Sequence, residues 1–145
     1  MARYLVLQGP NLNLLGLREP AIYGRRDLAA VEADLLHWAE ARGLALEFRQ
    51  SNQEGELIDA LQGAAGRCAG VVFNPGGFSH SSVALRDCIA ALPVPVVEVH
   101  LSNLHAREPW RQRSLTGGAA AGVISGFGEA GYRLALLHLT AGSAD

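Results

Sequence analysis

Lysine is absent from this sequence of 145 residues, since all 12 basic residues are arginine. Reactions that proceed through an imine between a substrate carbonyl and a lysine amine are therefore excluded. Cysteine is scarce as well, and Cys68 and Cys88 stand in no Cys-x-x-Cys or Cys/His pattern. The sequence thus predicts two reduced structural thiols and no zinc or other metal site.

Blocks of like charge and long apolar runs are also missing. The formal net charge is −2, and the dispersed charges predict neither nucleic-acid binding nor a membrane anchor. Residues 1–8 lack the apolar length and the cleavage pattern of a signal peptide, so we expect a cytoplasmic protein. A chain with 49% hydrophobic residues predicts a single domain over residues 1–145, with small molecules or further copies of itself as partners.

Short β-branched runs alternate with longer amphipathic stretches, which is typical of a parallel sheet covered by helices. The sequence predicts an α/β fold: a flavodoxin-like, doubly wound sheet of five parallel strands with helices on both faces. Strands are expected at Arg3–Gln8, Leu44–Gln50, Gly70–Asn74, Val94–Val99 and Gly122–Ser125. Helices are expected at Leu28–Arg42 after an Asp27 cap, Glu54–Ala65 after Asn52 or Gln53, Ser79–Ala91 and Gly128–His138.

Polar residues gather where the first, third and fourth predicted strands end, in the segments 9–13, 74–80 and 98–103. Doubly wound sheets bind ligands outside the carboxyl ends of their strands, so these segments predict one shared site. Taken singly, Asn11 and Asn74 are ordinary turn residues. His80 is expected at the start of a helix, where the dipole disfavours a cation, so we predict a neutral imidazole that faces a ligand.

A carboxylate interrupts the apolar fourth strand. Glu98 occupies a position expected to be interior, where an unpartnered carboxylate is rare. His100 lies two residues later and therefore on the same face of the strand, where the carboxylate can orient the imidazole. Such a pair is a proton-transfer device. The following segment, His100–Gly118, is predicted to be a functional loop with at most a turn or two of helix.

The long connection between the first strand and the first helix shows little secondary-structure signal, and we expect its residues 16–27 to form a lid. It carries Tyr23. A phenol is a poor base at neutral pH unless a guanidinium stabilises the phenolate, and Arg18, Arg25 or Arg26 could supply that charge. The alternative is that the tyrosine ring packs under the loop and the arginines are solvated.

These residues resemble those of the type II dehydroquinases. The resemblance begins with Gly9–Gly16, Arg18–Pro20 and Tyr23–Gly24, and continues in one register over essentially the whole chain. Its middle part comprises Gln50–Asn52, Glu54–Leu57, Asn74–Gly76, His80 and Ser82–Asp87. The strongest part is Glu98–Glu108, followed by Ala121–Ile124, Gly126 and Gly131–Tyr132.

The resemblance implies a dehydratase that converts 3-dehydroquinate to 3-dehydroshikimate by trans elimination through an enolate, without metal or cofactor. It implies that Tyr23 is the base that removes a C2 proton, with Arg18 stabilising its phenolate. Asn11 would hold a water on the enolate oxygen. His100, oriented by Glu98, would protonate the departing C1 hydroxyl.

The resemblance also implies the binding contacts and the assembly. The substrate carboxylate would contact Asn74, Ser102 and the backbone N–H of Leu101, and the substrate hydroxyls would contact His80, Arg111 and Asp87. The implied assembly is a dodecamer, a tetramer of trimers, in which Asp87 reaches the site of a neighbouring subunit. Such enzymes serve aromatic amino acid biosynthesis through the shikimate pathway or quinate catabolism, and the sequence fits either role.

The chain departs from the usual family pattern at Gln8, Gln53, Phe78 and the segment 116–118, and the last departure leaves the path of that loop open. Two other readings compete. A nucleotide-binding or flavin-binding module would share the fold, but the first loop lacks a glycine-rich phosphate cradle. A metal hydrolase would use Glu98, His100 and His105, whose spacing matches no named zinc pattern.

Overall fold

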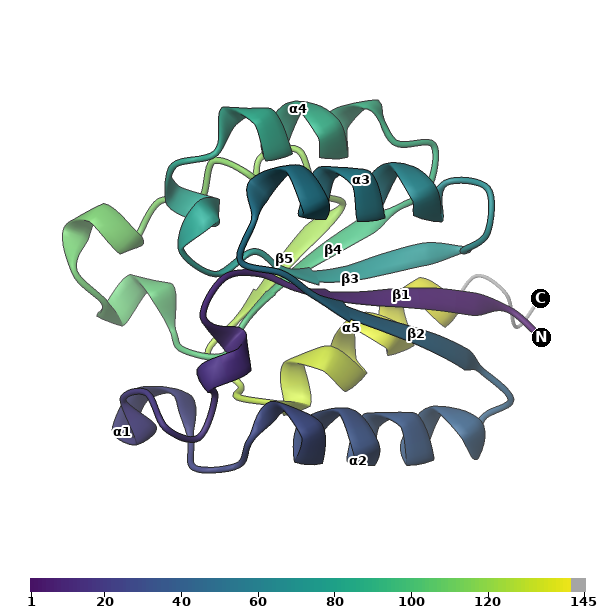
Figure 1. Ribbon diagram of the computed structural model, residues 1–145, viewed down its shortest axis with the longest axis horizontal. Helices are drawn as coiled ribbons and strands as arrows, with labels where there is room; N and C mark the ends of the chain where they lie inside the picture. Colours follow the sequence, from purple (N-terminus) through teal and green to yellow (C-terminus); the bar gives the residue numbers. More distant parts are fainter. Residues whose placement is uncertain (142–145) are drawn as a thin grey trace.

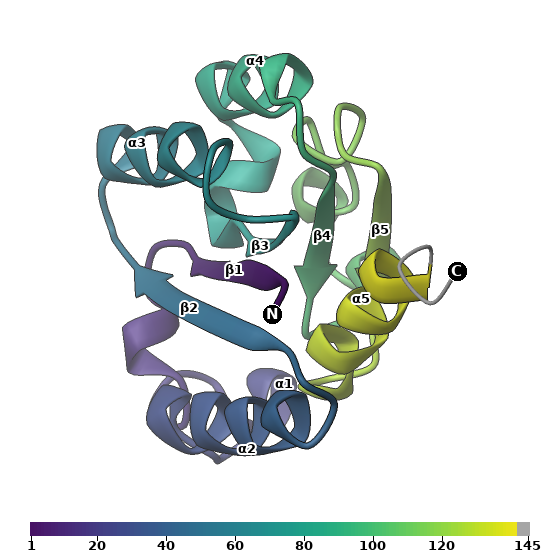
Figure 2. The same cartoon turned by 90° about the vertical axis from the view of Figure 1, so that its right-hand side faces the viewer.

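The computed structural model describes residues 1–141. Five parallel strands form one sheet in the order β2-β1-β3-β4-β5, with helices on both faces (Figures 1 and 2). The predicted flavodoxin-like α/β fold is thus confirmed. The strands are β1 (Arg3–Gln8), β2 (Ala45–Gln50), β3 (Gly70–Asn74), β4 (Val96–His100) and β5 (Gly122–Ser125).

Two helices cover each face of the sheet (Figures 1 and 2). On one face lie α2 (Leu28–Glu40) and α5 (Ala130–Ala141), and on the other lie α3 (Glu54–Ala64) and α4 (Val83–Ala91). Short helical turns occupy the connections at the carboxyl ends of the strands. They are η1 (Leu12–Leu14), α1 (Pro20–Tyr23), η2 (Gly76–His80), η3 (Leu104–Ala106) and η4 (Pro109–Arg111).

The core is divided by the sheet into two buried clusters, because side chains alternate between the two faces of a strand. Leu5 and Leu7 of β1 pack with α3 and α4. Tyr4 and Val6, the alternate residues of the same strand, pack with α2 and α5. Central strands buried on both faces read as nearly continuous apolar runs, which is why β1 and β3 were easy to predict. Within residues 1–141, no helix is long and apolar enough to cross a membrane.

Several strand and helix ends differ from prediction next to a proline or a glycine. β4 begins two residues late, at Val96, because Pro95 has no amide hydrogen for the ladder and contributes only its carbonyl, to Val71 N. α2 stops at Glu40, shortly before Gly43 with φ +71°. α5 starts after Gly128 with φ +59°. Both glycines adopt the left-handed conformation, which does not continue an α-helix.

The third predicted helix, Ser79–Ala91, is wrong in its first turns. The chain forms η2 up to His80, breaks at Ser81, and starts α4 at Val83. The reason is Ser82, whose Oγ accepts a hydrogen bond from Leu85 N at 2.9 Å and so caps the helix. His80 therefore ends a short turn and does not begin a helix, so the dipole argument for its neutrality does not apply.

The other predicted caps gave mixed results. Asp27 caps α2 as predicted, its Oδ1 accepting from Ala30 N at 2.8 Å. Gln53 precedes α3, but its side chain makes no capping bond. Ser51 Oγ instead accepts from Gln53 N at 2.9 Å. The neighbouring Asn52, the other predicted cap, is used elsewhere, as described below.

The connection between β1 and α2 is more structured than predicted, since it contains η1 and α1. Its residues 16–27, here called the 16–27 loop, form a closed loop whose ends touch. Gly16 has φ +92°, and a Cβ there would lie 2.8 Å from the carbonyl oxygen of Arg25. Arg26 fastens the outgoing end through ion pairs with Asp34 and, at 3.2 Å, with Glu129.

Candidate active site

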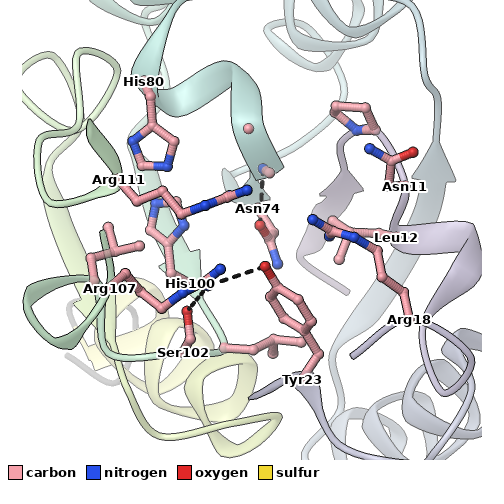
Figure 3. A pocket seen from close by; sticks show the side chains of 15 residues that line it. Asn11, Leu12, Arg18, Tyr23, Asn74, His80, His100, Ser102, Arg107 and Arg111 are labelled. Atoms are coloured by element: carbon pink, nitrogen blue, oxygen red, sulfur yellow. Dashed lines mark hydrogen bonds between the residues drawn. The ribbon is translucent and has the colours of Figure 1, made fainter. Parts of the chain in front are cut away.

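A pocket opens at the carboxyl ends of β1, β3 and β4, beside the point where the strand order reverses. This is where doubly wound sheets bind ligands. The loops after these strands and the 16–27 loop form its walls (Figure 3). Its lining residues are Pro10, Asn11, Leu12, Arg18, Tyr23, Asn74, Gly76, Gly77, His80, His100, Leu101, Ser102, Leu104, Arg107 and Arg111. They include every predicted site residue except Glu98 and Asp87.

The loops after β1 and β3 are pressed together at Gly9. Gly9 N donates to Asn74 O at 2.7 Å, and a Cβ at Gly9 would lie 2.5 Å from Pro75 O, so no larger residue fits. Asn11 follows in a left-handed conformation with φ 69°, and its N–H donates to Asn52 Oδ1 at 3.0 Å. Asn11 is therefore a turn residue and a pocket residue at once.

A buried hydrogen-bond chain fixes the side chain of Asn74. Asn74 Nδ2 donates to Tyr132 Oη at 3.2 Å, and Tyr132 Oη donates to Gln8 Oε1 at 2.9 Å. Asn74 Oδ1 accepts from Gly76 N at 3.1 Å. These contacts set the orientation of the amide, which keeps one N–H for a ligand in the pocket. Gln8, where the chain departs from the usual family pattern, therefore has a structural role. Its buried amide oxygen accepts the hydrogen bond from the Tyr132 hydroxyl.

We expect Tyr132 to make the protein sensitive to alkali. Burial raises the pKa of Tyr132 to about 12, whereas a tyrosine in the unfolded chain titrates near ~10. The unfolded state therefore loses this proton first, and stability falls as pH rises from ~10 towards ~12, by roughly 2 to 3 kcal/mol in all. Urea unfolding at pH 8 and pH 11 should show a smaller loss for Tyr132→Phe than for the wild type. Equal losses of stability in the two proteins would contradict a raised pKa of Tyr132 as the cause of the alkali sensitivity.

Tyr23 reaches the pocket from the end of α1, with two guanidinium groups beside it (Figure 3). Arg107 Nη1 donates to Tyr23 Oη at 3.1 Å and to Ser102 Oγ at 3.0 Å. The guanidinium carbon of Arg18 lies 4.9 Å from the centre of the tyrosine ring. Burial alone would lower the pKa of Arg107, but its hydrogen bonds to Tyr23 and Glu108 raise it overall, so the charge is kept. The phenol oxygen thus has a permanent cation in hydrogen-bond contact.

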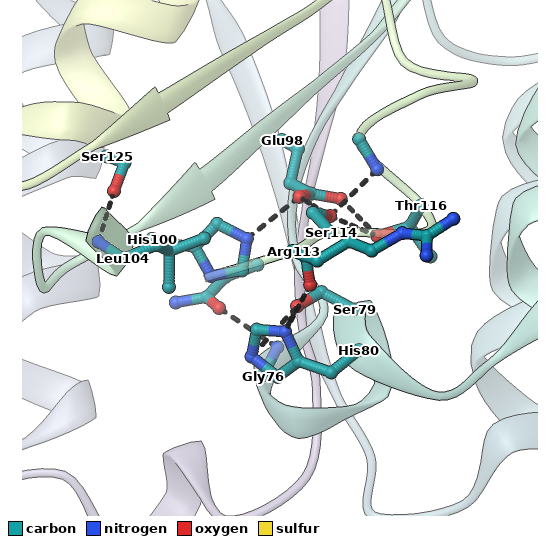
Figure 4. Close-up of polar contacts among 12 residues, drawn as sticks. Gly76, Ser79, His80, Glu98, His100, Leu104, Arg113, Ser114, Thr116 and Ser125 are labelled. Carbon is teal, nitrogen blue, oxygen red and sulfur yellow. Dashed lines mark hydrogen bonds and ion pairs between the residues drawn. The ribbon is translucent and has the colours of Figure 1, made fainter. Parts of the chain in front are cut away.

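His100 and Glu98 form the predicted pair on β4, with the carboxylate beside Nε2 of the imidazole (Figure 4). The distance from His100 Nε2 to Glu98 Oε2 is 2.8 Å, and the Glu98 side chain is 0% exposed. Burial alone would raise the pKa of Glu98, but hydrogen bonds from His100, Ser114 and Thr116 outweigh it and hold the pKa below its usual value. An ionised Glu98 accepts a hydrogen bond from Nε2–H, which leaves Nδ1 as the nitrogen available to a ligand.

The remaining predicted contacts surround this pair. The rings of His80 and His100 are stacked, with centroids 6.3 Å apart. His80 Nδ1 lies 2.7 Å from Arg113 O, so Nδ1 carries a hydrogen. Arg111 is held by Glu108, with Nε donating to Oε2 at 2.9 Å. Ser102 and Leu101 continue directly from β4 into the pocket wall.

Some candidates lie elsewhere. Asp87 is exposed on α4 and does not line the pocket of its own chain. Arg26 is engaged by Asp34 and Glu129, so it is not the cation beside Tyr23. His105 is exposed on η3, and among residues 1–141 no three His, Cys, Asp or Glu side chains are grouped as metal ligands. The three metal ligands that a metal hydrolase would need, Glu98, His100 and His105, are therefore not grouped in the structure.

Sequence reasoning gave no role to Arg107, Ser114 or Thr116. Arg107 and Tyr23 are 84 residues apart, so no local pattern could have paired them. The pairing depends on the path of the 100–118 segment, which brings Arg107 back over the 16–27 loop. For Thr116, the sequence feature that could have pointed to a role is a hydroxyl residue followed by two glycines. These residues form the segment 116–118, which departs from the usual family pattern.

Comparisons with known proteins agree with this geometry. The profile of the family described as dehydroquinase class II matches residues 2–140. The 3-dehydroquinate dehydratase 2 of Pseudomonas aeruginosa is 58% identical over 134 residues, which cover 92% of this chain and 90% of that protein. Catabolic 3-dehydroquinase 1 of Aspergillus terreus is 52% identical over 135 residues, 93% of this chain and 89% of that protein.

The solved structures include a match of the same kind. The crystal structure of the type II dehydroquinase from Butyrivibrio crossotus superposes with a TM-score of 0.94 at 38% sequence identity. The superposition covers 96% of this chain and 97% of that one. With a family profile, close relatives and a solved structure each spanning nearly the whole chain, this protein belongs to the class II dehydroquinases.

Proposed function

We propose that this protein eliminates water from 3-dehydroquinate to give 3-dehydroshikimate, with Tyr23 as the base and His100 as the acid. One observation carries the proposal. A single pocket holds a tyrosine hydrogen-bonded to a guanidinium and a histidine hydrogen-bonded to a buried carboxylate. In the first pair a cation lies against the phenol oxygen, and in the second a buried carboxylate lies against the imidazole. Dehydration beside a ketone requires one base and one acid, and these two pairs meet that requirement.

The base step uses the 16–27 loop as a lid. The Tyr23 phenolate removes a proton from C2, and the electrons of the C–H bond move into the C3 carbonyl to give an enolate. Arg107 and Arg18 stabilise the phenolate before the transfer. Asn11 holds a water that donates to the enolate oxygen, as in an oxyanion hole. Because Arg107 is already hydrogen-bonded to Tyr23 Oη, it stabilises the phenolate with little reorganisation.

The acid step expels the C1 hydroxyl. The enolate re-forms the ketone, its electron pair makes the C1=C2 double bond, and the C1–O bond breaks. His100 donates the Nδ1 proton to the departing oxygen, so that water leaves. Glu98 stabilises the imidazolium before the transfer, and its hydrogen bond with Nε2 keeps the remaining hydrogen of the neutral imidazole on Nε2 afterwards. Tyr23 then returns its proton to solvent and His100 takes one up, which restores the starting state.

Substrate orientation comes from groups on several loops. The side chains of Asn74 and Ser102 and the backbone N–H of Leu101 bind the substrate carboxylate. His80 of η2 and Arg111 of η4 bind the ring hydroxyls. Asp87 is exposed and outside the pocket of its own chain, so its proposed contact is with the pocket of a neighbouring subunit, in a dodecamer of four trimers.

The activity is tested by following the ultraviolet absorbance of the conjugated enone formed from 3-dehydroquinate. We expect turnover that persists after chelator treatment, because no residue assigned above uses a metal. Turnover should also persist after borohydride with substrate, because a chain without lysine forms no reducible side-chain imine. A folded wild-type protein that produces no enone would refute the proposed reaction.

A further inference from the structure

The carboxylate that orients His100 is itself held by the segment 114–117 (Figure 4). Ser114 Oγ donates to Glu98 Oε2 at 2.5 Å, and Thr116 Oγ1 donates to Glu98 Oε1. Gly117 N in turn donates to Ser114 Oγ at 2.9 Å. Both oxygens of a fully buried carboxylate thus have hydrogen-bond donors, and these donors lie on one short stretch of the crossover to β5.

The two hydroxyl groups are not equivalent. Glu98 Oε2 has two partners, His100 and Ser114. Among the hydrogen bonds within residues 1–141, Thr116 is the one donor to Oε1. Thr116 is 0% exposed, so no bulk water can take its place. Removing its hydroxyl would leave one oxygen of a buried anion without a partner, which strongly disfavours the charged form.

The backbone around Thr116 is shaped for this contact. A Cβ at Gly117 would lie 3.2 Å from Glu98 Oε2 and 2.9 Å from Val123 Cγ2, so the close approach requires glycine. At Gly118 a Cβ would lie 2.4 Å from Arg86 Nη1. Arg86 in turn donates to Leu115 O at 2.7 Å and ties the segment to α4. The two glycines therefore let the segment fit between the carboxylate and an arginine.

We infer that Thr116, with support from Ser114, is a positioning residue for the acid of the reaction: its hydroxyl keeps Glu98 ionised and aligned, and Glu98 keeps the Nε2–H tautomer of His100. The inference rests on the proposed role of His100. The Thr116-Gly117-Gly118 segment then contributes to catalysis without contacting the substrate, because Thr116 acts on Glu98 and Glu98 acts on His100.

The charged surroundings of Glu98 are few. His100 is the titratable group in direct contact, and His80 stacks on His100 from η2. In the sheet, Glu98 is flanked by Phe73 on β3 and Val123 on β5, which carry no charge. The nearest cation on α4, Arg86, points to Leu115 O. The ionisation of Glu98 thus depends on His100 and the two hydroxyls.

The test compares Thr116→Val, which has the same shape without the hydroxyl, with Thr116→Ser, which retains it. We expect Thr116→Val to lower kcat by about tenfold or more at neutral pH with little change in KM. The loss should be larger at acidic pH and smaller at alkaline pH, because Glu98 without this donor is protonated more easily. Thr116→Ser should remain within about threefold of the wild type at every pH.

Nitrogen NMR of the histidines supplies a readout that does not depend on turnover. In the wild type and in Thr116→Ser, His100 should show the hydrogen on Nε2, and in Thr116→Val this preference should be lost. Ser114→Ala, which removes the second donor, should shift the pH profile in the same direction by less, and replaces Thr116→Val if that variant does not fold. A Thr116→Val enzyme with the pH profile and His100 signal of the wild type would overturn the inference.

The outcome is separable from that of the proposed function. If the wild type makes no enone but Thr116→Val still changes the His100 signal, the reaction is wrong and the positioning role stands. If the wild type makes enone and neither hydroxyl variant alters the pH profile or the His100 signal, the reaction stands and the positioning role is wrong.

Discussion

Replacing Tyr23 by phenylalanine should lower kcat for 3-dehydroquinate dehydration by about 10²- to 10⁴-fold, the usual contribution of a positioned base. The substitution removes the oxygen that meets Arg107 and leaves the ring that Arg18 covers. KM should change little, because the binding contacts lie on the β3 and β4 loops. Steady-state enone formation measures both constants.

Tyr4 offers a matched control for that substitution. It is 1% exposed in the core between the sheet and α2, away from the pocket. Tyr4→Phe should therefore retain turnover close to that of the wild type. If Tyr23→Phe also retained full activity, the reaction could stand but another base would be needed.

The second large effect is expected at Arg107. Arg107→Met preserves much of the apolar stem but removes the donor to Tyr23 Oη and Ser102 Oγ. Its side chain is 10% exposed, so the interaction with the phenolate is only partly screened and we expect kcat to fall by about 10²- to 10³-fold. Steady-state enone formation by Arg107→Met and by the wild type measures the loss.

The matched control is Arg25→Met on the same loop as Tyr23. Arg25 is exposed and does not line the pocket, so this variant should lose less than about threefold, the size of a screened surface interaction. Equal losses in the two variants would mean that the net positive charge around Tyr23 matters and that the hydrogen bond from Arg107 does not.

The sequence was most informative where burial and backbone chemistry act locally. β1 and β3 are continuous apolar runs buried on both faces, and their predicted bounds agree with the structure. The bounds of β4 shifted because Pro95 cannot pair, and the third helix was split because Ser82 caps it. Each error concerns a terminus, where one hydrogen bond decides the outcome.

The pocket followed from topology more than from any single motif. Asn11, Asn74 and His100 are far apart in the sequence, yet parallel strands bring their carboxyl ends to one edge, so polar strand ends converge. The contacts of Arg107 and Thr116 could not be read in this way. They depend on how an irregular crossover folds back over the sheet, and no periodicity in the sequence encodes that path.

The touching ends of the 16–27 loop bear on how such a protein can change. Because Gly16 lies against Arg25, the separation between the two ends does not depend on the length of chain between them. A change in the length of the loop therefore does not displace β1 or α2. A longer loop adds only an entropic cost of closure that grows slowly with its length. The proposed base thus sits on an exchangeable module, while the proposed acid is built into a strand at the centre of the domain.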